Sequence, residues 1–99
     1  MDSLELRDFR LAVIASQHRS LRQAAEAMGI RQSTLSLRVR DLKYRLGIVL
    51  FERTNGGTRP TAAGLEFVEL ADHILEDAET ALRSVRHRSR GEQGKLTLD

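Results

Sequence analysis

The side chains best suited to recognising another molecule lie between residues 31 and 59 of this 99-residue sequence. Gln32 can form two hydrogen bonds with an adenine edge, and the hydroxyls of Ser33 and Ser36 suit a base edge or a phosphate. Leu37 suits the methyl group of thymine. The guanidinium groups that suit phosphate belong to Arg31, Arg38, Arg40, Arg53 and Arg59. These residue types predict recognition of nucleic acid, without excluding that the arginines are solvated surface charges.

Residues that perform catalysis or bind metals are scarce. The chain has no Cys, and His18, His73 and His87 are too dispersed to indicate a ligand set or a catalytic pair. We therefore expect no enzyme activity, metal or cofactor. No apolar run approaches the roughly 20 residues of a membrane span, and the first residues lack a signal-peptide pattern. A cytoplasmic, nucleoid-associated protein without membrane contact is expected.

Charge is divided unequally along the chain. Residues 1–60 contain 11 Lys or Arg and 6 Asp or Glu, a net charge of +5. Residues 61–99 contain 5 basic and 8 acidic residues, a net charge of −3, with no Lys or Arg between Thr61 and Leu82. The first part suits a phosphate partner, whereas the second would repel one.

Apolar spacing predicts two helices in the first 30 residues. A helix over about 4–17 would begin with a capping box between Asp2 and Glu5, and its apolar residues are Leu6, Phe9 and Val13. Ser20 is expected to cap a short second helix, whose apolar face comprises Leu21, Ala24, Ala25 and Met28. Gly29 would end this helix with a positive φ, and Ile30 would anchor the turn in the core.

A third helix and a small sheet are expected next. The helix would run from about Gln32 to Leu46, with a buried face of Leu35, Val39, Leu42 and Leu46. Residues 48–61 indicate a two-stranded wing, with Asn55-Gly56-Gly57 at its tip and Pro60 at the end of its second strand.

A long acidic helix is predicted from Thr61 to about Arg88. Its spacings of three and four are typical of a coiled-coil seam for dimerisation, formed by Val68, Ala71, Leu75, Ala78, Leu82 and Val85. Four neighbouring apolar residues would pack on the first helix: Phe67, Leu70, Ile74 and Ala81. Residues 89–94 interrupt the pattern, and residues 95–99 alternate like the first strand of a missing domain.

Two helices joined by a Gly-containing turn match the helix-turn-helix pattern, in which the second helix enters the major groove. Several separate short segments of the sequence also resemble segments of the LysR-type transcriptional regulators, in the same order and at the same spacing. They are residues 20–26 (SLRQAAE), 32–36 (QSTLS), 42–47 (LKYRLG), 50–53 (LFER) and 59–64 (RPTAAG).

The resemblance implies a mainly α fold in three parts. They are a winged helix-turn-helix domain at 1–60, a dimerising linker helix at 61–88, and a hinge with the start of an effector-binding domain at 89–99. It implies a homodimer on an interrupted palindrome of double-stranded DNA, with a tetramer possible for the full-length protein. A small-molecule effector would bind only through the missing C-terminal domain.

The resemblance also implies residue roles. Gln32, Ser33 and Ser36 match positions that touch bases or phosphate, and Arg53 matches a wing-side contact to the DNA backbone. The chain departs from the family pattern in three places. Arg31 stands where a hydroxyl cap is common, and Leu37 stands where a longer polar residue is common. Gly56 and Gly57 replace basic wing residues, which predicts a weaker grip on the minor groove.

Three alternatives use other features of the chain. An enzyme is disfavoured by the missing catalytic set. A coiled-coil interaction module would account for the long helix but not for the basic residues of 1–60. A different family of winged-helix regulators would share the fold.

Overall fold

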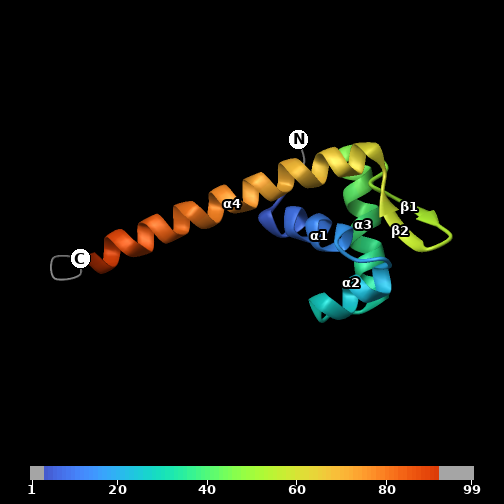
Figure 1. The fold of residues 1–99 in the computed structure, drawn as a ribbon, viewed down its shortest axis with the longest axis horizontal. Coiled ribbons are helices and arrows are strands. Elements are labelled where there is room, and N and C mark those ends of the chain that lie inside the picture. Colours follow the sequence, from blue (N-terminus) through green and yellow to red (C-terminus); the bar gives the residue numbers. More distant parts are fainter. Residues whose placement is uncertain (1–3, 92–99) are drawn as a thin grey trace.

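The computed structural model describes residues 4–91, which form four helices and one two-stranded antiparallel sheet. In chain order the elements are α1 (Leu6–Ser16), α2 (Leu21–Met28), α3 (Gln32–Leu46), β1 (Phe51–Thr54), β2 (Gly57–Pro60) and α4 (Ala62–Gly91). Helices α1 to α3 and the sheet gather at one end of α4, and the rest of α4 projects away from them (Figure 1). The molecule therefore measures 58 × 29 × 19 Å. The predicted mainly α, winged helix-turn-helix architecture is confirmed.

Helix α1 begins at a different cap from the one predicted. Glu5 occupies the N-cap, and its N–H donates a hydrogen bond of 2.8 Å to the carboxylate of Asp8. The helix thus starts at Leu6, later than expected, and the predicted cap Asp2 lies outside the described residues. Leu6 itself is exposed, because the face of α1 that enters the core contains Leu11, Ala12 and Ala15.

The turn between α2 and α3 forms as predicted. The Ser20 hydroxyl accepts a 3.1 Å hydrogen bond from the Gln23 N–H, a cap that typically stabilises a helix by about 1 kcal/mol. Gly29 has φ 71°, and the next residue, Ile30, donates its N–H to the carbonyl of Ala25 at 3.0 Å. This closure fixes where α3 begins relative to α2.

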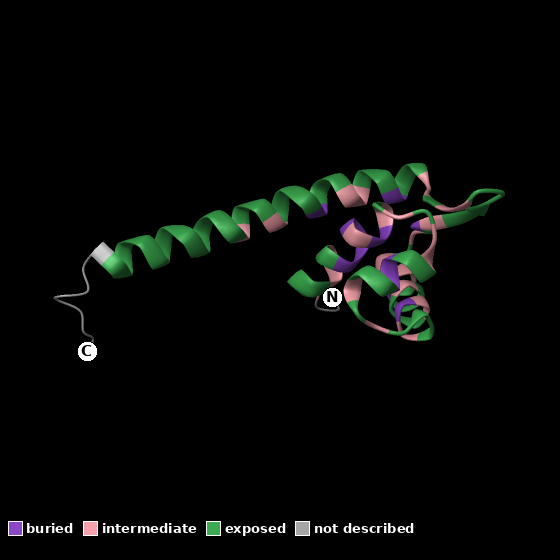
Figure 2. Cartoon of the chain, turned by 60° about the horizontal axis from the view of Figure 1, so that its bottom comes forward, coloured by how far each residue is buried: buried purple, intermediate pink, exposed green. Residues whose placement is uncertain are grey.

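The core is small and aliphatic. Its fully buried large side chains are Leu35 and Leu42 of α3 and Leu50, which precedes the sheet. Alanines of α1 and α2 (Ala12, Ala15, Ala24 and Ala25) let the helices approach closely around them. Burial is concentrated among α1 to α3, and α4 adds buried residues only in its first half (Figure 2). Val39 and Leu46 pack at the edge of this core, which confirms the predicted buried face of α3.

The wing is docked on the loop between α1 and α2. Its register pairs Arg53 with Thr58 and Glu52 with Arg59. The Thr58 N–H donates a 2.6 Å hydrogen bond to the carbonyl of Arg19 in that loop. Gly57 has φ 131°, and a Cβ at this position would overlap the same carbonyl. A glycine is therefore needed here for both backbone conformation and space.

Helix α4 starts at the predicted cap and ends beyond the predicted boundary. The Thr61 hydroxyl accepts the Gly64 N–H at 2.9 Å and donates to the carbonyl of Val49 at 2.5 Å. Gly64 is buried against the Leu50 carbonyl, which leaves no space for a Cβ. The helix continues through Ser89 and Arg90 to Gly91, three residues past Arg88. The strand predicted at 95–99 lies outside the described residues.

The faces of α4 differ from those expected. Ala71 is fully buried, and Val68 packs against the hydrophobic core of the same chain. Neither side chain is therefore exposed enough to contact a second copy of α4. Phe67 does pack on α1, where its ring lies 5.7 Å from that of Phe9. Leu70 and Ile74, however, are exposed rather than packed on α1. The prediction is confirmed for Phe67 but wrong for Leu70 and Ile74, because the face of α4 that α1 covers contains Phe67, Val68 and Ala71.

The second half of α4 has no cover within residues 4–91. From Glu79 to Arg90 every residue is exposed, including Ala81, Leu82 and Val85. None of the described helices is apolar enough over sufficient length to cross a membrane.

Candidate nucleic-acid interface

The outward face of α3 carries a regular stripe of exposed side chains. Ser33, Leu37, Arg40 and Tyr44 follow one another at spacings of four, three and four, opposite the buried Leu35 and Leu42. Leu37 is 59% exposed, unusual for a leucine with a core nearby. Tyr44 was missed by the sequence reasoning, although it continues the same spacing by one turn. Its ring lies 5.1 Å from the ammonium of Lys43.

A groove of about 320 Å³ separates the start of α3 from the wing. It brings Gln32 and Ser36 of α3 together with Arg53 of β1, three residues that the sequence predicted as DNA contacts. A neighbouring groove shares Ser36 and Arg53 and adds Arg40 and Lys43. These residues therefore lie on one continuous surface made by α3 and the wing.

The first groove also contains residues that the sequence reasoning missed. Ser20 and Arg22 enter it from the start of α2, and Thr58 enters it from β2. The available signal was the Ser20 cap, which places Arg22 within the first turn of α2. The sequence could not show that the wing lies next to the start of α2.

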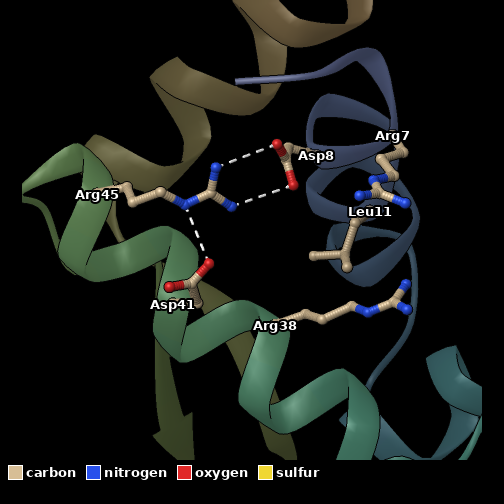
Figure 3. Close-up of a pocket in the computed structure, with 6 residues that line it drawn as sticks. All are labelled: Arg7, Asp8, Leu11, Arg38, Asp41 and Arg45. Carbon is tan, nitrogen blue, oxygen red and sulfur yellow. Dashed lines mark hydrogen bonds and ion pairs between the residues drawn. The ribbon is translucent and has the colours of Figure 1, made fainter. Parts of the chain in front are cut away.

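Arg38 lies away from this surface. It lines a crevice of about 200 Å³ between α1 and α3, with Arg7, Asp8 and Leu11 on one side and Asp41 and Arg45 on the other (Figure 3). Arg38, Asp41 and Arg45 share a flank of α3 because they are three and four residues apart. Arg38 therefore does not share the surface that α3 and the wing form around Arg40 and Arg53, and its predicted phosphate contact stays a prediction.

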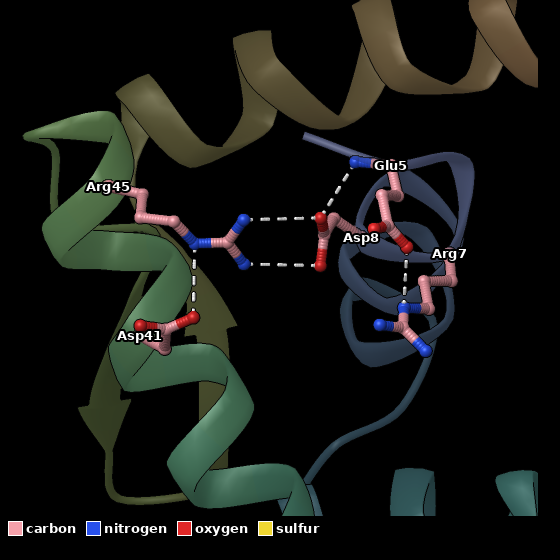
Figure 4. Close-up of polar contacts among 5 residues, drawn as sticks. All are labelled: Glu5, Arg7, Asp8, Asp41 and Arg45. Atoms are coloured by element: carbon pink, nitrogen blue, oxygen red, sulfur yellow. Dashed lines mark hydrogen bonds and ion pairs between the residues drawn. The ribbon is translucent and has the colours of Figure 1, made fainter. Parts of the chain in front are cut away.

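An ion-pair cluster in this crevice joins α3 to α1. The Arg45 guanidinium lies 3.3 Å from the Asp8 carboxylate and 3.0 Å from that of Asp41 (Figure 4). Burial raises the pKa of Asp8, but hydrogen bonds from the Glu5 N–H and Arg45, with the charges of Arg45 and Arg7, together lower that pKa below its ordinary value. The pair of Arg45 with Asp8 thus holds α3 against α1 while Asp8 is ionised, and Asp41 orients Arg45 from within α3.

The two remaining predicted phosphate contacts, Arg59 and Arg31, differ in whether the side chain is paired within the chain. Arg59 forms an ion pair of 3.1 Å with Glu52 directly across the sheet, on the opposite face from Arg53. It therefore lies outside the groove. Arg31 is the exposed N-cap of α3 and makes no side-chain capping hydrogen bond, as its residue type predicted.

An exposed helix face beside a docked two-stranded wing, with unneutralised basic residues, defines the class of winged helix-turn-helix DNA-binding domains. Residues 6–65 match the family model described as the bacterial regulatory helix-turn-helix protein, lysR family. The chain belongs to the LysR family, a family of transcriptional regulators rather than enzymes.

Individual relatives agree with this assignment. The chain is 36% identical over 95 residues to the HTH-type transcriptional regulator ClcR of Pseudomonas putida, covering 96% of this chain and 32% of ClcR. It is 37% identical to the regulator BudR of Klebsiella aerogenes, covering 96% of this chain and 66% of BudR. The chain thus spans about a third of the length of ClcR and of two similar Cupriavidus regulators.

Solved structures share the fold. The BenM DNA-binding domain, in a complex with catB site 1 DNA, superposes with a TM-score of 0.84 at 28% identity, over 90% of this chain and 96% of that one. The CbnR DNA-binding domain in a DNA complex gives 0.80 at 29% identity, over 87% and 99% of the two chains.

Proposed function

We propose that this chain binds double-stranded DNA sequence-specifically, with α3 in the major groove and the wing beside the adjoining minor groove. The observation that carries the proposal is the exposed stripe of α3, which continues into the groove that Arg53 lines. An α-helix fits the major groove, where side chains reach base edges. BenM and CbnR, whose DNA-binding domains share this fold, were each solved with DNA.

Residue roles follow from position. Gln32 and Ser33 stand in the first turn of α3, where recognition helices approach the bases, and Ser36 is one turn further. Leu37 would contact a thymine methyl, since it is exposed and has no polar group to offer. Arg40 and Arg53 would contact phosphates on either side of the helix, and Arg31 would contact phosphate from the end of α3.

We further infer that the chain acts as a homodimer through α4. The helix exposes Leu70, Ile74, Ala81 and Val85 along one side, at spacings of four, seven and four, with Leu82 beside them. Such a stripe on a projecting helix is stabilised when a second apolar surface covers it. This stripe replaces the first half of the predicted seam; of that seam, Leu82 and Val85 remain, and Ala78 is half-buried at its edge.

The charges of α4 favour an antiparallel pair. Its first part carries Glu69, Asp72, Glu76 and Glu79, and the same spacing then continues with Arg83, Arg86 and Arg90. A parallel pair would place like charges side by side, whereas an antiparallel pair places acidic segments against basic ones. Two recognition helices related in this way predict an interrupted palindrome.

The remaining roles belong to a full-length regulator. Effector binding and any tetramer would depend on a C-terminal domain, and the domain division at residues 60 and 88 remains part of this proposal. We propose that the protein acts at the nucleoid of the bacterial cytoplasm, where its DNA partner lies.

Selection of bound duplexes from a random library at near-physiological salt tests the proposal. Enrichment of an interrupted palindrome is the expected result. Enrichment of a single half-site would refute the dimer while keeping sequence recognition. Salt-sensitive binding without enrichment would refute sequence recognition by α3.

A further inference from the structure

The groove between α2 and the wing has the composition of an anion site. Its lining contains two guanidinium groups, those of Arg22 and Arg53, and no Asp or Glu. Within residues 4–91 neither of these side chains has a hydrogen-bond or ion-pair partner. In contrast, Arg59 on the other face of the wing is paired with Glu52. Two positive charges facing one groove without a counter-charge favour an anionic occupant.

Three segments hold this pair of arginines in place. The carbonyl of Arg19 accepts the Thr58 N–H at 2.6 Å, which fixes β2 on the loop before α2. Thr58 lies directly across the sheet from Arg53, so the same contact fixes the strand that carries Arg53. Ser20, the residue after Arg19, caps α2, which begins at Leu21, and this cap orients the backbone of Arg22 in the first turn. The distance between the backbones of the two arginines is therefore set before any ligand binds.

The position of the groove indicates which anion it meets. Gln32 and Ser36 of the recognition helix line its other side, so a DNA strand read by α3 passes this groove as it leaves the major groove. The tip of the wing, Asn55 and Gly56, carries no charge that could replace these arginines.

We propose that Arg22 and Arg53 together clamp a single phosphodiester of the DNA backbone between α2 and the wing. This inference rests on the proposed DNA binding and adds Arg22, with its role, to the interface. Each guanidinium donates to the phosphate oxygens, and the hydroxyl of Thr58 borders the same space. The clamp fixes the register of the protein on the duplex and reads no base.

Methylphosphonate scanning of a duplex obtained by library selection tests the clamp. Each modified duplex replaces one charged phosphate with a neutral methyl analogue, and the full chain is titrated against each duplex. For the unmodified protein we expect several sensitive positions, because Arg31 and Arg40 also contact phosphates, and at the clamped phosphate near each recognition helix affinity should fall about tenfold. Arg22→Gln and Arg53→Gln should each weaken binding to unmodified DNA by about tenfold and lower the salt slope by about 1. Both variants should lose their sensitivity at that same phosphate.

Two controls separate the clamp from other effects. Arg59→Gln removes an arginine from the opposite face of the wing, outside the groove, and should keep the sensitivity of the parent chain at the clamped phosphate. Arg22→Lys keeps the charge and should recover part of the affinity lost by Arg22→Gln, whereas a folding defect at this exposed site would not be rescued.

The outcomes distinguish the clamp from the function on which it rests. If the parent chain binds no duplex selectively, the proposed function fails. If it binds selectively but Arg22→Gln keeps full sensitivity at every phosphate, or if the two variants lose sensitivity at different phosphates, the clamp is overturned. A loss of affinity by Arg22→Gln for the selected duplex alone, with affinity for unrelated duplexes unchanged, would also overturn it in favour of a base contact.

Discussion

Gly57 offers a sharp test of how the wing is held, because its neighbour Gly56 is a matched control. An alanine at Gly57 would keep φ near 131°, where side chains cost about 1–2 kcal/mol, and its Cβ would overlap the Arg19 carbonyl. Relieving the overlap displaces the 2.6 Å hydrogen bond between the Thr58 N–H and that carbonyl, which contributes about 1 kcal/mol. The sum predicts a loss of about 2–3 kcal/mol. Gly56 has no positive φ and open space around it, so Gly56→Ala should change stability by less than about 0.5 kcal/mol.

Urea unfolding followed by circular dichroism measures both variants at equal protein concentration, since a dimer links stability to concentration. We expect Gly57→Ala to lower the midpoint and Gly56→Ala to leave it within error. DNA binding adds a second readout, because a displaced wing removes Arg53 from the groove while α3 stays in place. If the two variants unfold at the same urea concentration, or if Gly57→Ala binds DNA like the parent chain, the docking of the wing through Arg19 does not hold it in position.

Three further predictions address the other contacts. Because the pKa of Asp8 is lowered in the folded state, its ionised form stabilises the fold above the ordinary value of 3.8, and this contribution is lost as pH falls through the folded pKa. Asp8→Asn should therefore have a lower free energy of unfolding than the parent at pH 7, and this difference should shrink below about pH 4. A difference in unfolding free energy that stays constant from about pH 7 to about pH 3 would contradict the role of the Arg45 pair. Arg40→Gln should weaken DNA binding and lower the salt slope by about 1, whereas Arg38→Gln, in the crevice facing α1 (Figure 3), should leave the slope unchanged. Equal slopes for the two variants would contradict the placement of Arg38 outside the DNA-binding surface. Val85→Arg introduces a charge where the side chain is 65% exposed on α4, so it should favour monomers in sedimentation without lowering helicity; an unchanged dimer would exclude this stripe from the interface.

The misassigned face of α4 and the separation of Arg38 from Arg40 both concern what surrounds a helix. A repeat of three and four along a helix identifies an apolar face but not the partner that covers it. On α4 the sequence pattern ran through Val68 and Ala71, and it could not show that α1 of the same chain already covers them. Arg38 and Arg40 are likewise two residues apart and chemically identical. Helical spacing puts residues two apart on different sides of a helix, but only the packing of α3 shows that the Arg38 side faces α1 and the Arg40 side faces the wing.

What the sequence determined alone was local: the Ser20 and Thr61 caps, the turn at Gly29 and the extent of α3. These features depend on hydrogen bonds and backbone conformations within a few residues, which residue type dictates directly. Tertiary structure decided which distant segments meet, and here that meant the wing on the loop before α2. The groove shared by Arg22 and Arg53 depends on one hydrogen bond between residues 39 positions apart, Arg19 and Thr58. Neither periodicity nor composition encodes such a contact, because it arises only when both segments are anchored by the core between them.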